Sequence, residues 1–218
     1  MNIKRRLFAL ILSTLLTNSM NCQINDLFSE LNSFHIDSMI DSVEQTDPNS
    51  ASNSSLNLYY AIKYSKEGKV KKAIRYIDNS LKAEDSTTYL LALQFRGALY
   101  GLIGKYQKAL KDFENAYNIS KEPEFLNYLV EVSILSRDYH SALNYLKVFF
   151  DSDNNNYESI DSITLAHAYY FRAYSLRRTD SADSLVLADL HNALRYVSQE
   201  DSTGNFYIHL ELVKVYGT

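Results

Sequence analysis

The sequence has few of the residues that interrupt helices or crosslink chains. Its 218 residues include six glycines, two prolines, one cysteine and no tryptophan. So few turn-forming residues favour a helical protein over a β-sandwich or barrel, because those folds need many turns. A single cysteine excludes an intramolecular disulfide. A net charge of −4 argues against a nucleic-acid-binding protein, which would carry a basic surface.

The first 22 residues have the pattern of a secretory leader. Basic residues at positions 4–6 precede an apolar run at 7–16, and small and polar residues follow. The run is too short to span a bilayer as a stable helix. We therefore expect residues 1–22 to be a signal peptide and the protein to be exported to the periplasm or outer envelope. Cys22 either carries a lipid anchor or leaves with the signal peptide.

Several stretches of the chain align with one another at the spacing of helical hairpins. AIKYSKEGKVKKAIRY begins at Ala61, GALYGLIGKYQKALKDFENAY at Gly97 and AYSLRRTDSADSLVLADLHNAL at Ala173. Each has a small residue, a large residue three positions later, a turn, and then apolar residues at helical spacing. LVEVSILSRDYHSALNYL fits the same frame more loosely. The equivalent positions in the second segment of each stretch are Ala73, Ala109, Ala142 and Val186.

This pattern resembles the tetratricopeptide repeat (TPR), in which a small residue, an aromatic and a glycine turn precede Ala–x3–Phe–x2–Ala. The unit at 90–122 matches best, through Gly97, Tyr100, Gly104, Tyr106, Ala109, Phe113 and Ala116. The other units are expected at 54–87, 123–156 and 166–200; the third replaces the glycine turn by Arg137-Asp138. The resemblance implies an all-α fold, a right-handed helical-hairpin solenoid of about four TPR-like units.

Two glycines of the best-matching unit have separate predicted roles. Gly97 lacks a side chain, so we expect the two helices of the pair to approach closely there. Gly104 is expected to end the first helix in a left-handed conformation, which glycine adopts without strain. The repeat pattern does not explain Gly101.

The segments on either side of the repeats are predicted to be caps. Residues 23–53 carry apolar residues at helical spacing as far as Asp47-Pro48, where a helix would stop. Residues 201–218 predict a single closing helix with Phe206, Leu210 and Val213 on one stripe. A helical-repeat array needs such caps because its terminal units would otherwise expose apolar faces.

In the TPR family the first helix of each pair lines a concave groove that binds peptides or partner helices. By the family's inner positions, the resemblance assigns to this groove Leu58, Ile62, Gln94, Asn127, Glu131, His167, Tyr170, Tyr174 and Arg177. Tyrosine and arginine often dominate the energy of interfaces. The alternative for Tyr170 and Tyr174 is that they pack between helices. The basic side chains with which some family members bind C-terminal carboxylates are not evident.

No catalytic motif stands out, so we predict a protein that is not an enzyme and has no cofactor or metal. His167 and His191 fall on two helices of one unit, but scattered histidines are more often solvated or hydrogen-bonded. Asp-Ser dipeptides, as at Ser162 and Ser184, resemble the O-glycan acceptor motif of exported Bacteroidetes proteins. The same dipeptides are also favoured at helix N-caps, and both interpretations stay open.

The sequence therefore predicts a protein–protein interaction scaffold or adaptor of the cell envelope, which binds a peptide or a partner protein in its groove. The alternative is a periplasmic immunity or inhibitor protein that occludes a toxin or enzyme; acidic charge, small size and export suit that function. A repeat fold specifies a surface and not a chemistry, so the partner and the oligomeric state are not predicted.

Overall fold

The computed structural model describes residues 53–82, 86–151, 160–179, 181–197 and 202–217. Within these ranges all regular secondary structure is α-helical, which confirms the predicted all-α class. The predicted signal peptide, Cys22 and nearly all of the predicted N-terminal cap lie outside the described residues. No helix in the described ranges combines the length and the apolar character needed to cross a membrane.

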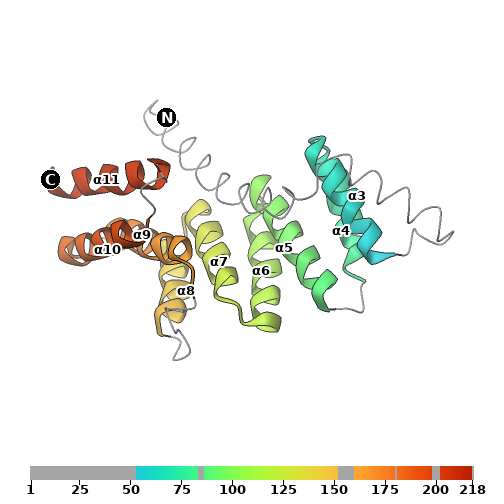
Figure 1. The fold of residues 1–218 in the computed structure, drawn as a ribbon, viewed down its shortest axis with the longest axis horizontal. Helices are drawn as coiled ribbons and strands as arrows, with labels where there is room; N and C mark the ends of the chain where they lie inside the picture. Colours follow the sequence, from blue (N-terminus) through green and yellow to red (C-terminus); the bar gives the residue numbers. More distant parts are fainter. Residues whose placement is uncertain (1–52, 83–85, 152–159, 180, 198–201, 218) are drawn as a thin grey trace. The chain divides into compact units, whose positions relative to one another are not determined.

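The described residues up to Ile119 form one compact unit, which contains two helical hairpins. Helix α3 (Ser54–Lys66) pairs with α4 (Val70–Ser80), and α5 (Ser86–Leu102) pairs with α6 (Tyr106–Ser120), as Figure 1 shows. Helix α4 also packs on α5, and α3 reaches α5. The core around the first hairpin consists of Leu56, Ala61, Ile62, Ala73, Ile77, Ala92, Phe95 and Leu99.

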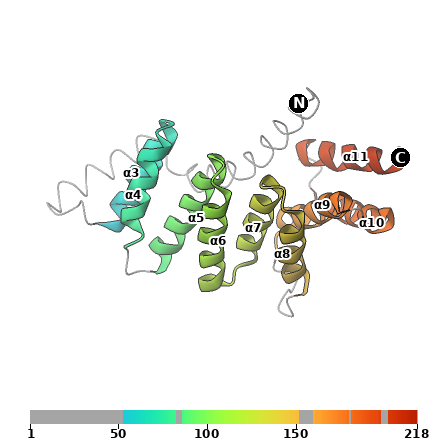
Figure 2. The same cartoon turned by 180° about the vertical axis from the view of Figure 1, so that it is seen from behind.

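The described residues from Ser120 onward form a second compact unit. Its helices are α7 (Pro123–Leu135), α8 (Tyr139–Asp151), α9 (Ser162–Arg178), α10 (Asp183–Tyr196) and α11 (Ser202–Tyr216). Helix α7 pairs with α8 and α9 with α10, while α8 also packs on α9 and α11 on α10 (Figure 2). The Asp161 carboxylate caps α9 by accepting a hydrogen bond from the Thr164 N–H at 2.8 Å, so the Asp-Ser dipeptide at Ser162 is a helix N-terminus.

One turn geometry closes the first helix of three hairpins. Gly68 and Gly104 both have φ of +72°, and Arg137 occupies the same position with φ of +64°. In each turn the next residue donates its N–H to a carbonyl five residues back, at 2.8 Å; the pairs are Lys69 to Tyr64, Lys105 to Tyr100 and Asp138 to Ser133. This is the Schellman arrangement that ends helices. The predicted left-handed role of Gly104 is confirmed, and the third hairpin keeps the turn without a glycine.

The left-handed turn predicts opposite changes in stability for substitutions at Gly104 and at Arg137. A Cβ at Gly104 would meet nothing within 4 Å, so Gly104→Ala changes only the backbone preference. We expect it to lower the free energy of unfolding by about 1 kcal/mol, because left-handed backbone costs a side-chain-bearing residue roughly 1–2 kcal/mol. Arg137→Gly should raise the free energy of unfolding, because glycine adopts left-handed backbone without strain. The gain should be at most about 0.5 kcal/mol, because glycine also loses more conformational entropy on folding than arginine does. Urea unfolding of both variants, followed by circular dichroism, measures the two effects. A loss on Arg137→Gly would contradict this account of the turn.

The close approach predicted at Gly97 is confirmed. A Cβ built on Gly97 would lie 2.9 Å from both Cε1 and Cζ of Phe113, inside van der Waals contact. Phe113 belongs to α6 and is 1% exposed, so its ring has little room to withdraw. The absence of a side chain at Gly97 therefore sets the distance between α5 and α6.

Candidate functional site

The predicted groove positions of the first unit lie on α3 and α5. Ile62 is buried in the core, whereas Leu58 and Gln94 are half-buried and keep part of their surface exposed. Leu58 packs against the core of the first hairpin through its inner side. Leu91 on α5 is half-buried too. The partly exposed side chains on α3 and α5 therefore include the apolar residues Leu58 and Leu91.

The two predicted groove positions on α7 are buried. Asn127 is 7% exposed and Glu131 is 2% exposed. The Asn127 Nδ2 donates a hydrogen bond to the Thr164 carbonyl at 3.3 Å, which ties α7 to the first turn of α9. The expectation that these two side chains face an open groove needs correction, because in this unit they help hold the helices together.

The tyrosines predicted to anchor a partner are also buried. Tyr170 is 9% exposed and Tyr174 is 2% exposed, with their ring centroids 6.1 Å apart. The Arg178 guanidinium lies 3.3 Å from the centroid of the Tyr174 ring, a cation–π contact. Packing between helices, the alternative that the sequence left open, describes both residues. Neither ring is available to a partner in this arrangement.

Arg177, the last predicted groove residue of α9, is bound to the C-terminal helix. Its Nη1 donates to the Glu211 Oε2 at 2.7 Å, and Lys214 donates to the other oxygen of the same carboxylate. The Glu211 side chain is only 3% exposed, so two cations compensate a buried charge. Helix α11 thus lies beside the very positions of α9 that were expected to bind a partner.

Burial of the two tyrosines makes the stability of the second unit sensitive to alkali. Desolvation raises the pKa of both Tyr170 and Tyr174, whereas tyrosine in an unfolded chain has a pKa of about 10. Above this value the folded chain binds more protons than the unfolded chain, so the free energy of unfolding falls as pH rises.

We therefore expect Tyr174→Phe to lose less stability than the unaltered chain when the pH is raised from about 9 to about 11. Tyr216→Phe, which alters an exposed ring on α11, is the matched control and should follow the unaltered chain. Urea unfolding at each pH, with tyrosinate absorbance recorded in parallel, measures the difference. Equal alkaline losses in all three proteins would show that the Tyr174 phenol is not protected.

His167 and His191, which the sequence places on two helices of one unit, do not belong to a cluster of metal-ligating side chains among the described residues. His167 is half-buried with its ring 5.9 Å from that of Phe171, and His191 is exposed on α10. Among the described residues there is no group of three or more His, Cys, Asp or Glu side chains placed to hold a metal ion.

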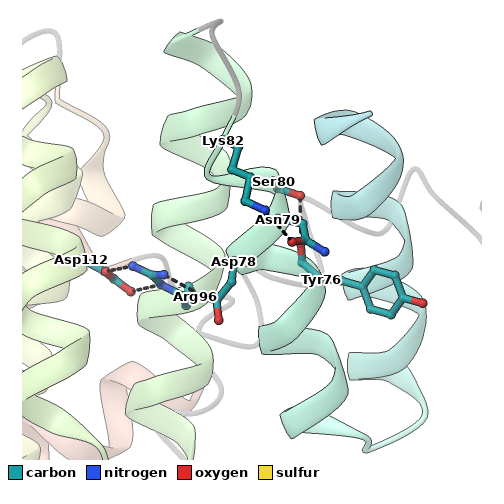
Figure 3. Close-up of polar contacts among 7 residues, drawn as sticks. All are labelled: Tyr76, Asp78, Asn79, Ser80, Lys82, Arg96 and Asp112. Carbon is teal, nitrogen blue, oxygen red and sulfur yellow. Dashed lines mark hydrogen bonds and ion pairs between the residues drawn. The ribbon is translucent and has the colours of Figure 1, made fainter. Parts of the chain in front are cut away.

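An arginine at the second hairpin joins three consecutive helices. Arg96 of α5 makes a bidentate contact with Asp112 of α6, with Nε–Oδ2 and Nη2–Oδ1 distances of 2.8 and 2.7 Å. Its Nη1 also contacts Asp78 of α4 at 2.7 Å (Figure 3). The Asp112 side chain is 3% exposed and that of Asp78 is 49% exposed. The hydrogen bonds with Asp112 raise the pKa of the Arg96 guanidinium.

The fourth hairpin repeats this arrangement. Arg172 of α9 contacts Asp189 of α10, with Nε–Oδ2 and Nη2–Oδ1 distances of 2.8 and 2.6 Å. The Arg172 guanidinium also lies 3.9 Å from the centroid of the Phe150 ring on α8. In both hairpins the arginine directly precedes the small residue of the first helix, and the aspartate follows the aligned Ala or Val by three positions. We call these two positions the facing positions.

Neither of these two Arg–Asp pairs was predicted from the sequence. Asp112 and Asp189 occupy equivalent places, and so do Arg96 and Arg172. An arginine and an aspartate that recur together in aligned units are a signal of direct pairing. The signal was easy to miss because the first hairpin has Tyr60 and Tyr76 at the facing positions.

A tyrosine and two lysines gather at the turns of both hairpins in the first unit. Lys69 and Lys72 lie 5.8 and 3.8 Å from the centroid of the Tyr64 ring. The second hairpin repeats this: Lys105 and Lys108 lie 5.9 and 5.4 Å from the centroid of the Tyr100 ring. A hydrogen bond with Lys72 lowers the pKa of the Tyr64 phenol. The spacing Tyr–x3–Gly–Lys–x2–Lys occurs in both hairpins.

Comparison with solved structures agrees with the helical-repeat fold. The structure is similar to that of the MamA RS-1 ArsTM double mutant, with a TM-score of 0.59 and 12% sequence identity, over 88% of this chain and 97% of that chain. MamA is a TPR-like protein, so this likeness supports the predicted TPR-like fold. At this level of identity the likeness concerns the fold alone. No family model and no curated protein sequence matches the chain.

Proposed function

We propose that the protein is a non-enzymatic interaction scaffold of the cell envelope that binds a partner protein through the α3–α5 face of its first unit. The single observation that carries this proposal is the accessibility of that face. Two of the three predicted groove positions in the first unit, Leu58 and Gln94, are half-buried, as is Leu91 on α5. Four of the six in the second unit, Asn127, Glu131, Tyr170 and Tyr174, are buried. The cores of interfaces are depleted of charged residues, and none of Leu58, Leu91 and Gln94 is charged.

A position-specific crosslink tests this assignment. A photoreactive phenylalanine analogue would replace Leu58 or Leu91 in the full chain, expressed in the native host. The matched control replaces Val148, which is 45% exposed on α8 of the second unit. We expect one partner of defined mass at both α3–α5 positions and a much lower yield from the control. Equal yields from all three positions would contradict a binding face on α3 and α5.

The same experiment separates the two functions that the sequence predicts. An envelope component recovered at a fixed stoichiometry favours the scaffold. A secreted toxin or enzyme whose activity falls when the protein is added favours the inhibitor. Alanine substitution of Tyr170 or Tyr174 is unsuitable for this purpose, because removing a buried ring costs several kcal/mol of stability and would reduce binding indirectly.

Export is part of the proposal and has its own test. It rests on the leader pattern of residues 1–22 and on Cys22 directly behind the apolar run. Cells grown with an alkyne-labelled fatty acid should yield labelled protein if Cys22 is lipidated, and Cys22→Ser should abolish the label. An unlabelled chain that begins after position 22 in the periplasm would instead show that the cysteine leaves with the leader. Retention of the whole chain in the cytoplasm would contradict export.

A further inference from the structure

The facing positions of the second and fourth hairpins contact the helix that precedes each hairpin. In the second hairpin Arg96 reaches Asp78 of α4, the helix that precedes the hairpin. In the fourth, Arg172 lies against Phe150 of α8, again the preceding helix. In both cases the side chain on the first helix of the hairpin contacts the helix that comes before it in the chain. In these two hairpins, the facing positions therefore form the contact with the helix that precedes the hairpin.

In the first hairpin the facing positions hold two stacked tyrosines. The ring centroids of Tyr60 and Tyr76 are 5.0 Å apart, and Tyr64 lies 5.2 Å from Tyr76. All three rings are half-buried. Figure 3 shows Asp78 turned toward Arg96, whereas Tyr76 points to the other side of α4, away from α5. The tyrosines thus form an aromatic surface at the positions through which the second and fourth hairpins contact their preceding helices.

The rim of this aromatic surface is basic. Lys69 and Lys72 extend over the Tyr64 ring, and Lys71 and Arg75 are exposed on the same helix or its turn. Glu67, which pairs with Lys69 at 2.7 Å, is the one acidic residue between positions 63 and 75. A protein with a net charge of −4 therefore has a locally positive surface here.

The part of the chain that precedes α3 has the complementary charge. Residues 23–53 contain six acidic residues and no lysine or arginine; the acids are Asp26, Glu30, Asp37, Asp41, Glu44 and Asp47. The same segment has apolar residues at helical spacing, including Leu27, Leu31 and Phe34. It leads directly into Asn53, the N-cap of α3. Such a tether raises the effective concentration of the segment at this surface to the millimolar range.

We propose that residues 23–53 dock on the facing positions of the first hairpin, with apolar side chains against Tyr60, Tyr64 and Tyr76 and carboxylates opposite Lys69 and Lys72. The segment then takes the place that α4 has for the second hairpin and α8 for the fourth. Aromatic rings supply contact area, and the ion pairs select an acidic segment over other chain. This inference goes beyond the proposed partner face, because it concerns a different surface and an occupant within the chain.

Zero-length crosslinking of the purified full chain tests the docking directly. A carbodiimide joins carboxylates to lysine amines that are in contact, and peptide mass mapping locates the joined residues. We expect crosslinks from the acids of 23–53 to Lys69 and Lys72 to exceed those to Lys147, exposed on α8, by about fivefold or more, the factor that roughly 1 kcal/mol gives. The excess should shrink in about 1 M salt, where the Debye length is about 3 Å. An even distribution over all lysines would overturn the proposal.

A second copy or an outside partner could occupy the surface instead, and isotopes distinguish these cases. In a mixture of light and heavy chains, docking within the chain gives crosslinks of one isotope only. Mixed-isotope crosslinks would show that the segment of a neighbouring copy is bound and would overturn docking in cis. Crosslinks of Lys69 and Lys72 to another protein alone would do the same. None of these outcomes affects the α3–α5 test, so the two proposals can fail separately.

A fluorescence measurement guards against an effect of misfolding. The chain has no tryptophan, so Phe34→Trp introduces a single reporter into the segment. We expect Lys69→Gln combined with Lys72→Gln to increase acrylamide quenching of this reporter at least twofold. Lys105→Gln combined with Lys108→Gln is the matched control, because it alters the same turn in the hairpin that already has α4 as predecessor. Identical quenching in both double variants would overturn the assignment.

Discussion

Asp112→Ala should lower the free energy of unfolding of the first unit by about 3 kcal/mol, which is a large share of the stability of a small domain. The carboxylate is 3% exposed and accepts two hydrogen bonds from Arg96. Removing it leaves a partly buried guanidinium without its main partner, and an uncompensated buried charge is costly. The urea midpoint should fall by roughly 1–2 M. Hydrogen exchange of α5 and α6 locates the loss within the unit.

Asp78→Ala is the matched control for this prediction. Asp78 contacts the same arginine at the same distance of 2.7 Å, but its side chain is 49% exposed. Exposed ion pairs contribute about 0–1 kcal/mol, since solvent screens the charges. We therefore expect Asp78→Ala to cost less than about 1 kcal/mol. If the two alanine variants were equally unstable, burial would not be the cause of the effect.

The first hairpin suggests a double substitution that should avoid the loss of stability expected for Asp112→Ala. Its facing positions hold Tyr60 and Tyr76, which stack without any charge. Replacing a buried ion pair by well-packed apolar groups is often neutral for stability. Arg96→Tyr combined with Asp112→Tyr should therefore be more stable than Asp112→Ala alone. If the double variant were less stable than Asp112→Ala, the facing positions of the two hairpins would not be interchangeable.

The sequence was sufficient for the features of the fold that depend on short-range pattern. Apolar spacing predicted the helical hairpins, and Gly97 and Gly104 have the predicted close approach and left-handed backbone. These features depend on residues within about one hairpin. The repeat frame begins the fourth unit at 166, whereas α9 begins at Ser162 with Asp161 as its N-cap.

The candidate site was harder to predict because it depends on contacts between distant segments. Family inner positions gave Tyr170, Tyr174 and Arg177 as a surface, but Glu211 of α11 binds Arg177 from 34 residues away. A repeat pattern describes each unit as if it stood in the middle of an array. The sequence predicted a closing helix within 201–218, but the repeat pattern does not show which side chains of the last unit that helix contacts. Among the predicted groove positions, Leu58 and Gln94 in the first unit and His167 and Arg177 in the second are half-buried, and Arg177 is already bound by Glu211.

Gly97→Val should lower the free energy of unfolding by about 3 kcal/mol, at the upper end of the usual cost of overpacking. Even a Cβ would lie 2.9 Å from the Phe113 ring, and valine adds two methyl groups. The ring is held in the core and the α5 backbone is held by Arg96, so neither side can withdraw cheaply. The helix propensity of valine is higher than that of glycine, which offsets only a few tenths of a kcal/mol. Urea unfolding followed by circular dichroism measures the loss.

Phe113→Leu should rescue Gly97→Val, and the chain itself supplies the reason. The positions equivalent to Gly97 and Phe113 are occupied by Val130 and Leu146 in the third hairpin and by Ala173 and Leu190 in the fourth. A larger first residue goes with a smaller second one, and all four of these side chains are buried. Phe113→Leu alone should cost roughly 1–2 kcal/mol, because it leaves a cavity. In the double variant valine fills that cavity, so we expect the two losses to cancel by about 2 kcal/mol. Strictly additive losses would mean that the glycine is needed for a reason other than the phenylalanine opposite it.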